Sequence, residues 1–112
     1  MKQALDGIRV LDFTIWQQGP IASAALADMG AEVIKIEERV GGDPGRGLVW
    51  RSDQTALATY FECHNRNKKG IALDVRKDKG REVVYRLAKN ADVFVQNFRP
   101  GVVERLKIDY KT

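Results

Sequence analysis

The chain has 112 residues, of which 44% are hydrophobic and 30% charged, a balance typical of one small folded domain and not of a disordered segment. No apolar run approaches the roughly 20 residues of a membrane span, and the N-terminus lacks the unbroken apolar core of a secretory signal, so we expect a cytoplasmic protein with no membrane partner. A single cysteine excludes an internal disulfide framework, and one cysteine with one histidine does not supply a four-ligand zinc site. We therefore expect no metal.

The charge is unevenly distributed along the chain. Residues 1–50 carry five Lys or Arg and seven Asp or Glu, whereas residues 51–112 carry fourteen and eight. The basic second half indicates an anionic partner, for which nucleotide phosphates and RNA both qualify. The alternative is a basic face that meets only solvent.

The first 37 residues have the pattern of a strand, a bend, a helix and a second strand. Gly7–Phe13 is almost continuously apolar, which is typical of a buried parallel strand. Pro20 suits the first turn of a helix, and the alanine-rich run Ile21–Met29 continues it. Val33–Ile36 is the second strand. In such a βαβ unit the loop after the first strand, Thr14–Gln18, faces the ligand.

The next segment, residues 37–50, contains four glycines and a proline and is predicted to be a loop. It matches neither the P-loop nor the G-x-G-x-x-G pattern, so it is a weak nucleotide motif. Asp43 within it is interpreted as a turn former and not as a nucleophile. Residues 55–65 fit a short helix or an extended segment equally well, and the polar run 65–70 is predicted to be a turn.

The second half repeats the alternation of strand and helix. Strands are predicted at Ile71–Val75 and Asp92–Val95, and helices at Lys77–Lys89 and from Val102 to Lys107. This order predicts an α/β fold, a Rossmann-like parallel sheet with flanking helices.

Loops that follow parallel strands meet at one edge of the sheet, where ligands usually bind. The side chains expected there are basic or carry amides: Gln17, Gln18, Arg39, Arg46, Arg76, Lys77, Asn97 and Arg99. Trp16 and Phe98 add flat aromatic surface, and the backbone N–H groups that open the last helix add an anion site. A purine nucleotide with several phosphates fits this composition.

Conventional catalytic groups are missing from the pattern. Cys63 and His64 are adjacent, but neighbours in sequence seldom face each other and no third orienting group is evident. No pair of carboxylates has a spacing that suits general acid and base catalysis. The sequence therefore predicts a binding surface with no catalytic residue among these 112.

Five blocks of the sequence carry a family resemblance. They are LDGIRVLDFT, QQGPIASAALADMGAEVIKIE, GGDPGRG, NRNKKGIALDVRKDKG and ADVFVQNFRPGVVERL. In this order and spacing the chain resembles the N-terminal part of the family III CoA-transferases, which include formyl-CoA and carnitine-related CoA-transferases and α-methylacyl-CoA racemase.

The resemblance implies an enzyme that transfers CoA between an acyl-CoA and a carboxylic acid, with CoA thioesters and acids as substrates and an interlocked homodimer as the assembly. Transfer would proceed through an aspartyl anhydride. Residues 1–112 would form the N-terminal part of the Rossmann-like CoA-binding domain. The family's catalytic aspartate lies in a later segment, so we expect these 112 residues alone to be inactive.

The resemblance also implies the CoA contacts. They map onto Gln17, Gln18, Arg39, Leu73, Asp74, Val75, Arg76, Asn97, Phe98 and Arg105, with adenine near Leu73 and Arg76. Two positions depart from the family pattern. Glu38 stands where an arginine often follows the second strand, and Ile15 stands at a position that is often polar in formyl-CoA transferases, which argues against oxalate and formate as substrates.

Three alternatives remain open at this point. One is an acyl-CoA racemase of the same family, which shares this region. Another is a stand-alone Rossmann-like module that binds nucleotide or RNA without catalysis, although the sequence lacks G-x-G-x-x-G and aromatic RNP patterns, so no nucleic-acid partner is expected. The third is a structural piece whose folding needs further chain.

Overall fold

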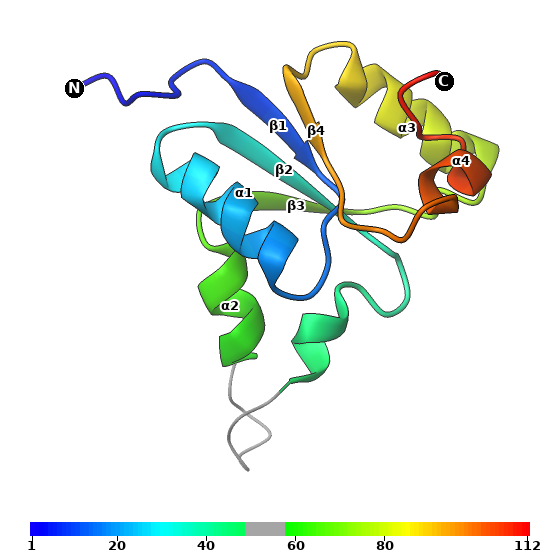
Figure 1. The fold of residues 1–112 in the computed structure, drawn as a ribbon, viewed down its shortest axis with the longest axis horizontal. Coiled ribbons are helices and arrows are strands. Elements are labelled where there is room, and N and C mark those ends of the chain that lie inside the picture. The colour runs from blue at the N-terminus through cyan, green and yellow to red at the C-terminus, as the bar shows by residue number, and fades with distance from the viewer. Residues whose placement is uncertain (49–57) are drawn as a thin grey trace.

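A computed structural model describes residues 1–48 and 58–112. Four strands form one parallel sheet in the order β3-β2-β1-β4 (Figure 1). Their bounds are β1 Arg9–Asp12, β2 Glu32–Glu37, β3 Lys68–Ala72 and β4 Val93–Val95. The predicted α/β fold with a parallel sheet is confirmed.

The helices connect the strands in the predicted alternation. They are α1 Gln18–Asp28, the short 3₁₀ helix η1 Pro44–Gly47, α2 Thr59–Asn65, α3 Asp78–Ala88 and α4 Val102–Leu106. None of the helices within the described ranges combines the length and the apolar composition that a bilayer crossing requires.

Two apolar clusters lie on opposite faces of the sheet, because successive strand residues point to alternate faces. Val10 and Val33 pack with Ala27 of α1 on one face. On the other face, Phe13 and Ile36 pack with Val84 of α3 and with Ile108. Charged and polar side chains on the sheet face that α1 covers are therefore buried, and they need partners in the interior.

The central strand β1 marks the point where the chain changes direction across the sheet. β2 and β3 lie on one side of β1, and β4 lies on the other. The loops after β1 and β4 therefore leave the same edge at a topological switch point, where α/β proteins form their ligand crevice.

The third strand differs from its prediction. The predicted turn 65–70 is shorter, since Asn67 turns the chain with φ of 61° and β3 begins at Lys68. The polar residue Lys68 enters the sheet because its amine is buried against acceptors, among them an Asp12 carboxylate oxygen at 2.9 Å. β3 then ends at Ala72, and residues 73–75 follow the strand at its carboxyl end.

Two further boundaries are now defined. Helix α1 begins at Gln18, before the proline that was expected to open it. The ambiguous segment 55–65 is helical over Thr59–Asn65, whereas residues 55–57, like residues 49–50 of the glycine-rich loop, lie outside the described residues.

Candidate functional site

A pocket of about 290 Å³ lies at the carboxyl ends of the strands, and we call it the carboxyl-end pocket. Its walls are mostly apolar, with acidic residues and one arginine at the rim. The lining residues are Phe13, Ile15, Ile36, Glu37, Glu38, Gly42, Asp43, Pro44, Leu73, Asp74, Val75, Arg76, Phe98 and Leu106. An apolar hollow with a few polar groups suits one flat ring better than a whole charged nucleotide.

The rim of the pocket is held by Arg76, which links two loops. Its Nε donates a hydrogen bond to an Asp74 carboxylate oxygen at 2.9 Å, and its guanidinium lies 3.4 Å from a Glu38 oxygen. The hydrogen bond from Arg76 holds the pKa of Asp74 below its ordinary value. Arg76 remains largely exposed, so its guanidinium can also meet a ligand anion at the mouth of the pocket.

Glu37, at the end of β2, anchors the glycine-rich loop. It receives two hydrogen bonds from Arg46, at 2.8 and 2.7 Å, and one from the backbone N–H of Asp43. Arg46 also lies over the Phe61 ring, 3.7 Å from its centroid. The guanidinium of Arg46 thus has a structural role toward Glu37 and Phe61, and Arg46 also lines the shallow hollow that contains Arg39.

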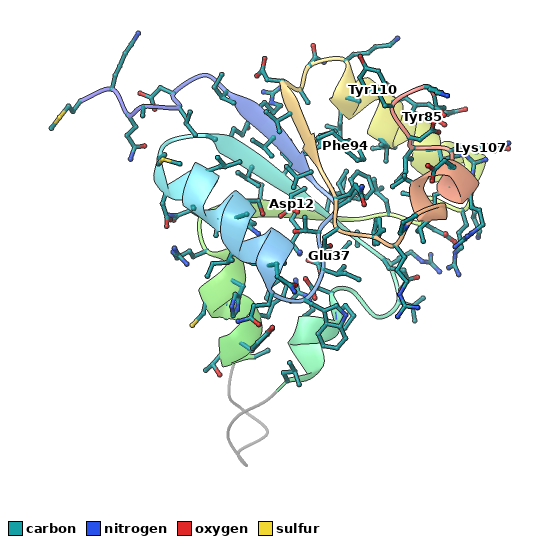
Figure 2. All side chains as sticks on the ribbon, in the orientation of Figure 1. Asp12, Glu37, Tyr85, Phe94, Lys107 and Tyr110 are labelled. Carbon is teal, nitrogen blue, oxygen red and sulfur yellow. The ribbon has the colours of Figure 1, made fainter. Side chains whose placement is uncertain are left out.

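The loop after β1, residues 14–17, runs past the pocket into α1, and Figure 2 shows Asp12 beneath that helix. Asp12 accepts hydrogen bonds from the Thr14 backbone N–H at 2.8 Å and from the Thr14 hydroxyl. Asp12 therefore fixes the bend that follows β1. Ile15 is held on both backbone atoms by the amide of Asn97, at 2.9 and 2.8 Å.

The ten residues predicted to contact CoA fall into two groups. Those after β3, together with Phe98, line the carboxyl-end pocket: Leu73, Asp74, Val75, Arg76 and Phe98. The others lie around it. Gln17 and Gln18 are exposed at the start of α1, the Asn97 amide is occupied by Ile15, Arg39 lines a separate shallow hollow, and Arg105 is exposed on α4.

Sequence reasoning missed two buried ion pairs beneath these loops. Lys35 lies 2.9 Å from Asp43, and Lys68 lies 2.9 Å from Asp12, with all four side chains at most 2% exposed. The available signal was Lys35 itself. It shares its strand face with buried Val33, and a charge on a buried face requires a partner.

Other features of the described residues do not form a site. His64 Nδ1 lies 2.7 Å from the Tyr60 carbonyl of its own helix. No three His, Cys, Asp or Glu side chains within residues 1–48 and 58–112 gather closely enough to ligate a metal ion. A hollow of about 570 Å³ near Phe94 and Tyr110 contains none of the predicted contact residues.

Comparison with known proteins matches residues 5–112 to the model of CoA-transferase family III. A formyl-CoA:oxalate CoA-transferase of Afipia carboxidovorans is 43% identical over 111 residues, which cover 99% of this chain and 26% of the relative. One from Rhodopseudomonas palustris is 45% identical over 106 residues, which cover 95% of this chain and 25% of the relative. The chain thus spans about a quarter of the length of these relatives.

Solved structures agree in fold. A hypothetical protein of Mycobacterium tuberculosis, Rv3272, superposes with a TM-score of 0.88 at 42% identity, over 97% of this chain and 29% of the other. A CAIB/BAIF family protein from Brucella suis superposes with a TM-score of 0.87 at 35% identity, over 99% of this chain and 30% of the other. With its parallel sheet, its carboxyl-end pocket and a family match over nearly its whole length, the chain belongs to CoA-transferase family III.

Proposed function

We propose that these residues form the CoA-binding part of a CoA-transferase that exchanges CoA between an acyl-CoA and a carboxylic acid. The observation that carries the proposal is the carboxyl-end pocket, which lies at the switch point of a parallel sheet and is lined by five of the ten predicted contacts. Its apolar walls suit the adenine ring, and Arg76 at the rim suits a phosphate.

The rest of the CoA molecule extends beyond the pocket in this proposal, because about 290 Å³ accommodates little more than the nucleoside. Arg105 on α4 and the amide side chains of Gln17 and Gln18 are then further contacts. Basic groups at the pocket mouth would meet phosphate oxygens through charge-assisted hydrogen bonds. Arg39 and Asn97 complete the proposed set.

The transfer chemistry is assigned to residues outside these 112. An aspartate carboxylate attacks the thioester carbonyl, the C–S bond breaks, and CoA leaves as a thiolate while a mixed anhydride forms. The thiolate then attacks the aspartyl carbonyl, which releases the first acid and leaves an aspartyl-CoA thioester. The second acid attacks this thioester and frees the thiolate, which takes the acyl group from the new anhydride and restores the aspartate. In this scheme residues 1–112 hold CoA but do not react, and without the aspartate they have no turnover. We further propose that the complete protein is a cytoplasmic homodimer.

The acid substrates are tested together with the reaction type. The named relatives act on formyl-CoA and oxalate according to their names, whereas Ile15 argues against these substrates. A panel of acyl-CoA and acid pairs, including formyl-CoA with oxalate, decides between them. Incorporation of solvent deuterium at the α-carbon of a branched acyl-CoA, without CoA exchange, would instead identify a racemase.

The proposed site is tested by calorimetry with CoA on the full-length protein. We expect the dissociation constant to rise by about tenfold to a hundredfold in Arg76→Ala and in Arg105→Ala, because each change removes a charge-assisted hydrogen bond. Arg66→Ala is the matched control, since Arg66 is paired with Asp28 at the far end of α1. If the wild-type protein bound no CoA, the proposal would fail.

A further inference from the structure

The backbone of the β1 loop is held by side chains that come from distant parts of the chain. The Thr14 carbonyl accepts a hydrogen bond from Lys35 Nζ of β2 at 2.7 Å. The Trp16 N–H donates to Asp43 Oδ1 of the glycine-rich loop at 3.1 Å. Lys35 and Asp43 therefore fix the loop backbone on either side of Ile15.

Lys35 and Asp43 also form an ion pair with each other. Lys35 Nζ lies 2.9 Å from Asp43 Oδ2, as a close ion pair and not as an aligned hydrogen bond. The other carboxylate oxygen, Oδ1, receives both the Trp16 N–H and the Gly45 N–H, the latter at 2.8 Å. One buried pair thus joins β2, the glycine-rich loop and the β1 loop.

The loop conformation needs such support. Trp16 has a φ of 70°, in the left-handed region that a bulky side chain rarely adopts. A bulky residue in this region is strained and persists only where the surroundings fix it. The next two residues, Gln17 and Gln18, open α1, so the direction in which they project depends on the peptide at Trp16.

We infer that Lys35 and Asp43 are positioning residues, which set the β1 loop so that Gln17 and Gln18 face CoA. This inference rests on the proposed function. Both side chains are at most 2% exposed, so they act on the ligand through the loop, and Asp43 reaches the carboxyl-end pocket only as part of its wall. Asp43 is therefore neither a nucleophile nor a ligand group, and its acidity serves to hold Lys35 and the Trp16 N–H.

The effect of this ion pair on stability can be separated from its effect on the loop. Removing one member of a buried ion pair leaves an uncompensated charge, whereas replacing both by apolar residues is often neutral for stability. A K35M/D43L variant therefore avoids an unpaired buried charge, and its unfolding temperature should fall only by what the lost backbone hydrogen bonds cost. It nevertheless leaves the Thr14 carbonyl and the Trp16 N–H without their partners.

The experiment compares full-length wild type, K35M/D43L and K35M/D43N. Asparagine keeps an Oδ1 acceptor, so the second variant retains the hydrogen bonds from the Trp16 and Gly45 N–H groups. We expect the CoA dissociation constant to rise by about tenfold to a hundredfold in K35M/D43L, the scale of a misplaced contact group, and by less in K35M/D43N. Asp28→Asn, which weakens an ion pair at the far end of α1, is the control and should bind as wild type.

Amide hydrogen exchange of peptide 14–18 supplies a readout that does not depend on CoA. We expect faster exchange at Trp16 in K35M/D43L and wild-type exchange in Asp28→Asn. Unchanged exchange in K35M/D43L, or faster exchange with wild-type CoA affinity, overturns the inference. Absence of CoA binding by wild type overturns the proposed function alone, and the exchange rates then still test the support of the loop. If K35M/D43L does not fold, K35M/D43N, which lacks the hydrogen bond from Lys35 to the Thr14 carbonyl, is compared with wild type by the same measurements.

Discussion

Lys68 shows how a single charged residue is accommodated in the interior of this molecule. Burial lowers the pKa of Lys68, and the nearby charge of Asp12 only partly offsets that effect. The amine is surrounded by three acceptors at 2.8 to 2.9 Å, on Asp12, Pro20 and Asn65. Such a group ties one strand and two helices together, because its acceptors lie on β1, α1 and α2.

Glu37 offers a pH-dependent test at the same scale. Burial alone would raise the pKa of Glu37, but the hydrogen bonds from Arg46 and the Asp43 N–H outweigh it, and the pKa is lowered. The folded state therefore gains stability from ionised Glu37 above the ordinary pKa of the group. This gain is lost as the pH falls through the lower, folded-state pKa.

We expect Glu37→Gln to flatten the acid branch of the stability profile. The fall in the midpoint of thermal unfolding between pH 7 and about pH 3 should be smaller in the variant than in wild type, because the neutral amide no longer titrates. Glu104→Gln is the control, since Glu104 is exposed and has no ion pair among residues 1–48 and 58–112. Identical acid branches for Glu37→Gln and wild type would contradict the expectation.

At the scale of elements, the contact between α1 and the β1 loop is unusually close. A Cβ atom added at Gly19 would lie 2.4 Å from Thr14 Cβ and 3.1 Å from Asn97 Cγ. Thr14 cannot move aside easily, because its backbone and hydroxyl are bound by Asp12 and its carbonyl by Lys35. Helix α1 thus requires glycine at its second residue.

Gly19→Ala should displace the helix from the loop. We expect a destabilisation of about 1–3 kcal/mol, the usual cost of overpacking, together with weaker CoA binding. Thermal unfolding and calorimetry on the full-length protein measure the two effects. Gly70→Ala, at a strand position where an added Cβ would meet nothing within 4 Å, should leave both values unchanged. A Gly19→Ala protein as stable as Gly70→Ala would show that the helix can shift freely.

The order of the elements was predictable from sequence because it depends on local periodicity. The helix around Val84 and the strand around Val33 both carry the apolar spacing that buries one face. The start of β3 was not predictable in this way. Lys68 looks like a turn residue, and only contacts with residues as far away as Asp12 place it in the sheet.

The candidate site was likewise predictable only in part. Residues 73–76 and Phe98 gather at the pocket because strand ends meet at one edge, which the topology alone implies. The contacts of Lys35 with Thr14 and of Asp43 with Trp16 join three segments of the chain, and no spacing rule encodes such a junction. The charge of Arg46 indicated a lining residue, but its hydrogen bonds with Glu37 could not be predicted from the sequence.

At the scale of the whole molecule, the formal charge is +4, and the excess of basic residues lies in the second half of the chain. That half supplies β3 and the segments that follow it, including Arg76 and Arg105. The summed charge of these basic residues would attract a polyanionic ligand, in addition to the individual contacts that the ligand makes.

CoA binding should therefore weaken with salt, whereas adenosine binding should not. Between about 50 and 500 mM monovalent salt we expect the dissociation constant for CoA to rise several-fold, because screening shortens the reach of surface charges. Adenosine carries no phosphate and serves as the control in the same titration series. Equal salt dependence for the two ligands would mean that the basic residues do not contribute to binding.

The central place of β1 in the sheet also has a consequence for folding kinetics. β1 can pair with β2 as soon as residue 37 is available, but its other edge waits for β4, which begins at Val93. Closing a loop of this length precedes any gain from the contact, so the β1–β4 pairing belongs to the late events of folding. Until then the open edge of the most buried strand can pair with another chain, and the yield of refolding should fall as protein concentration rises.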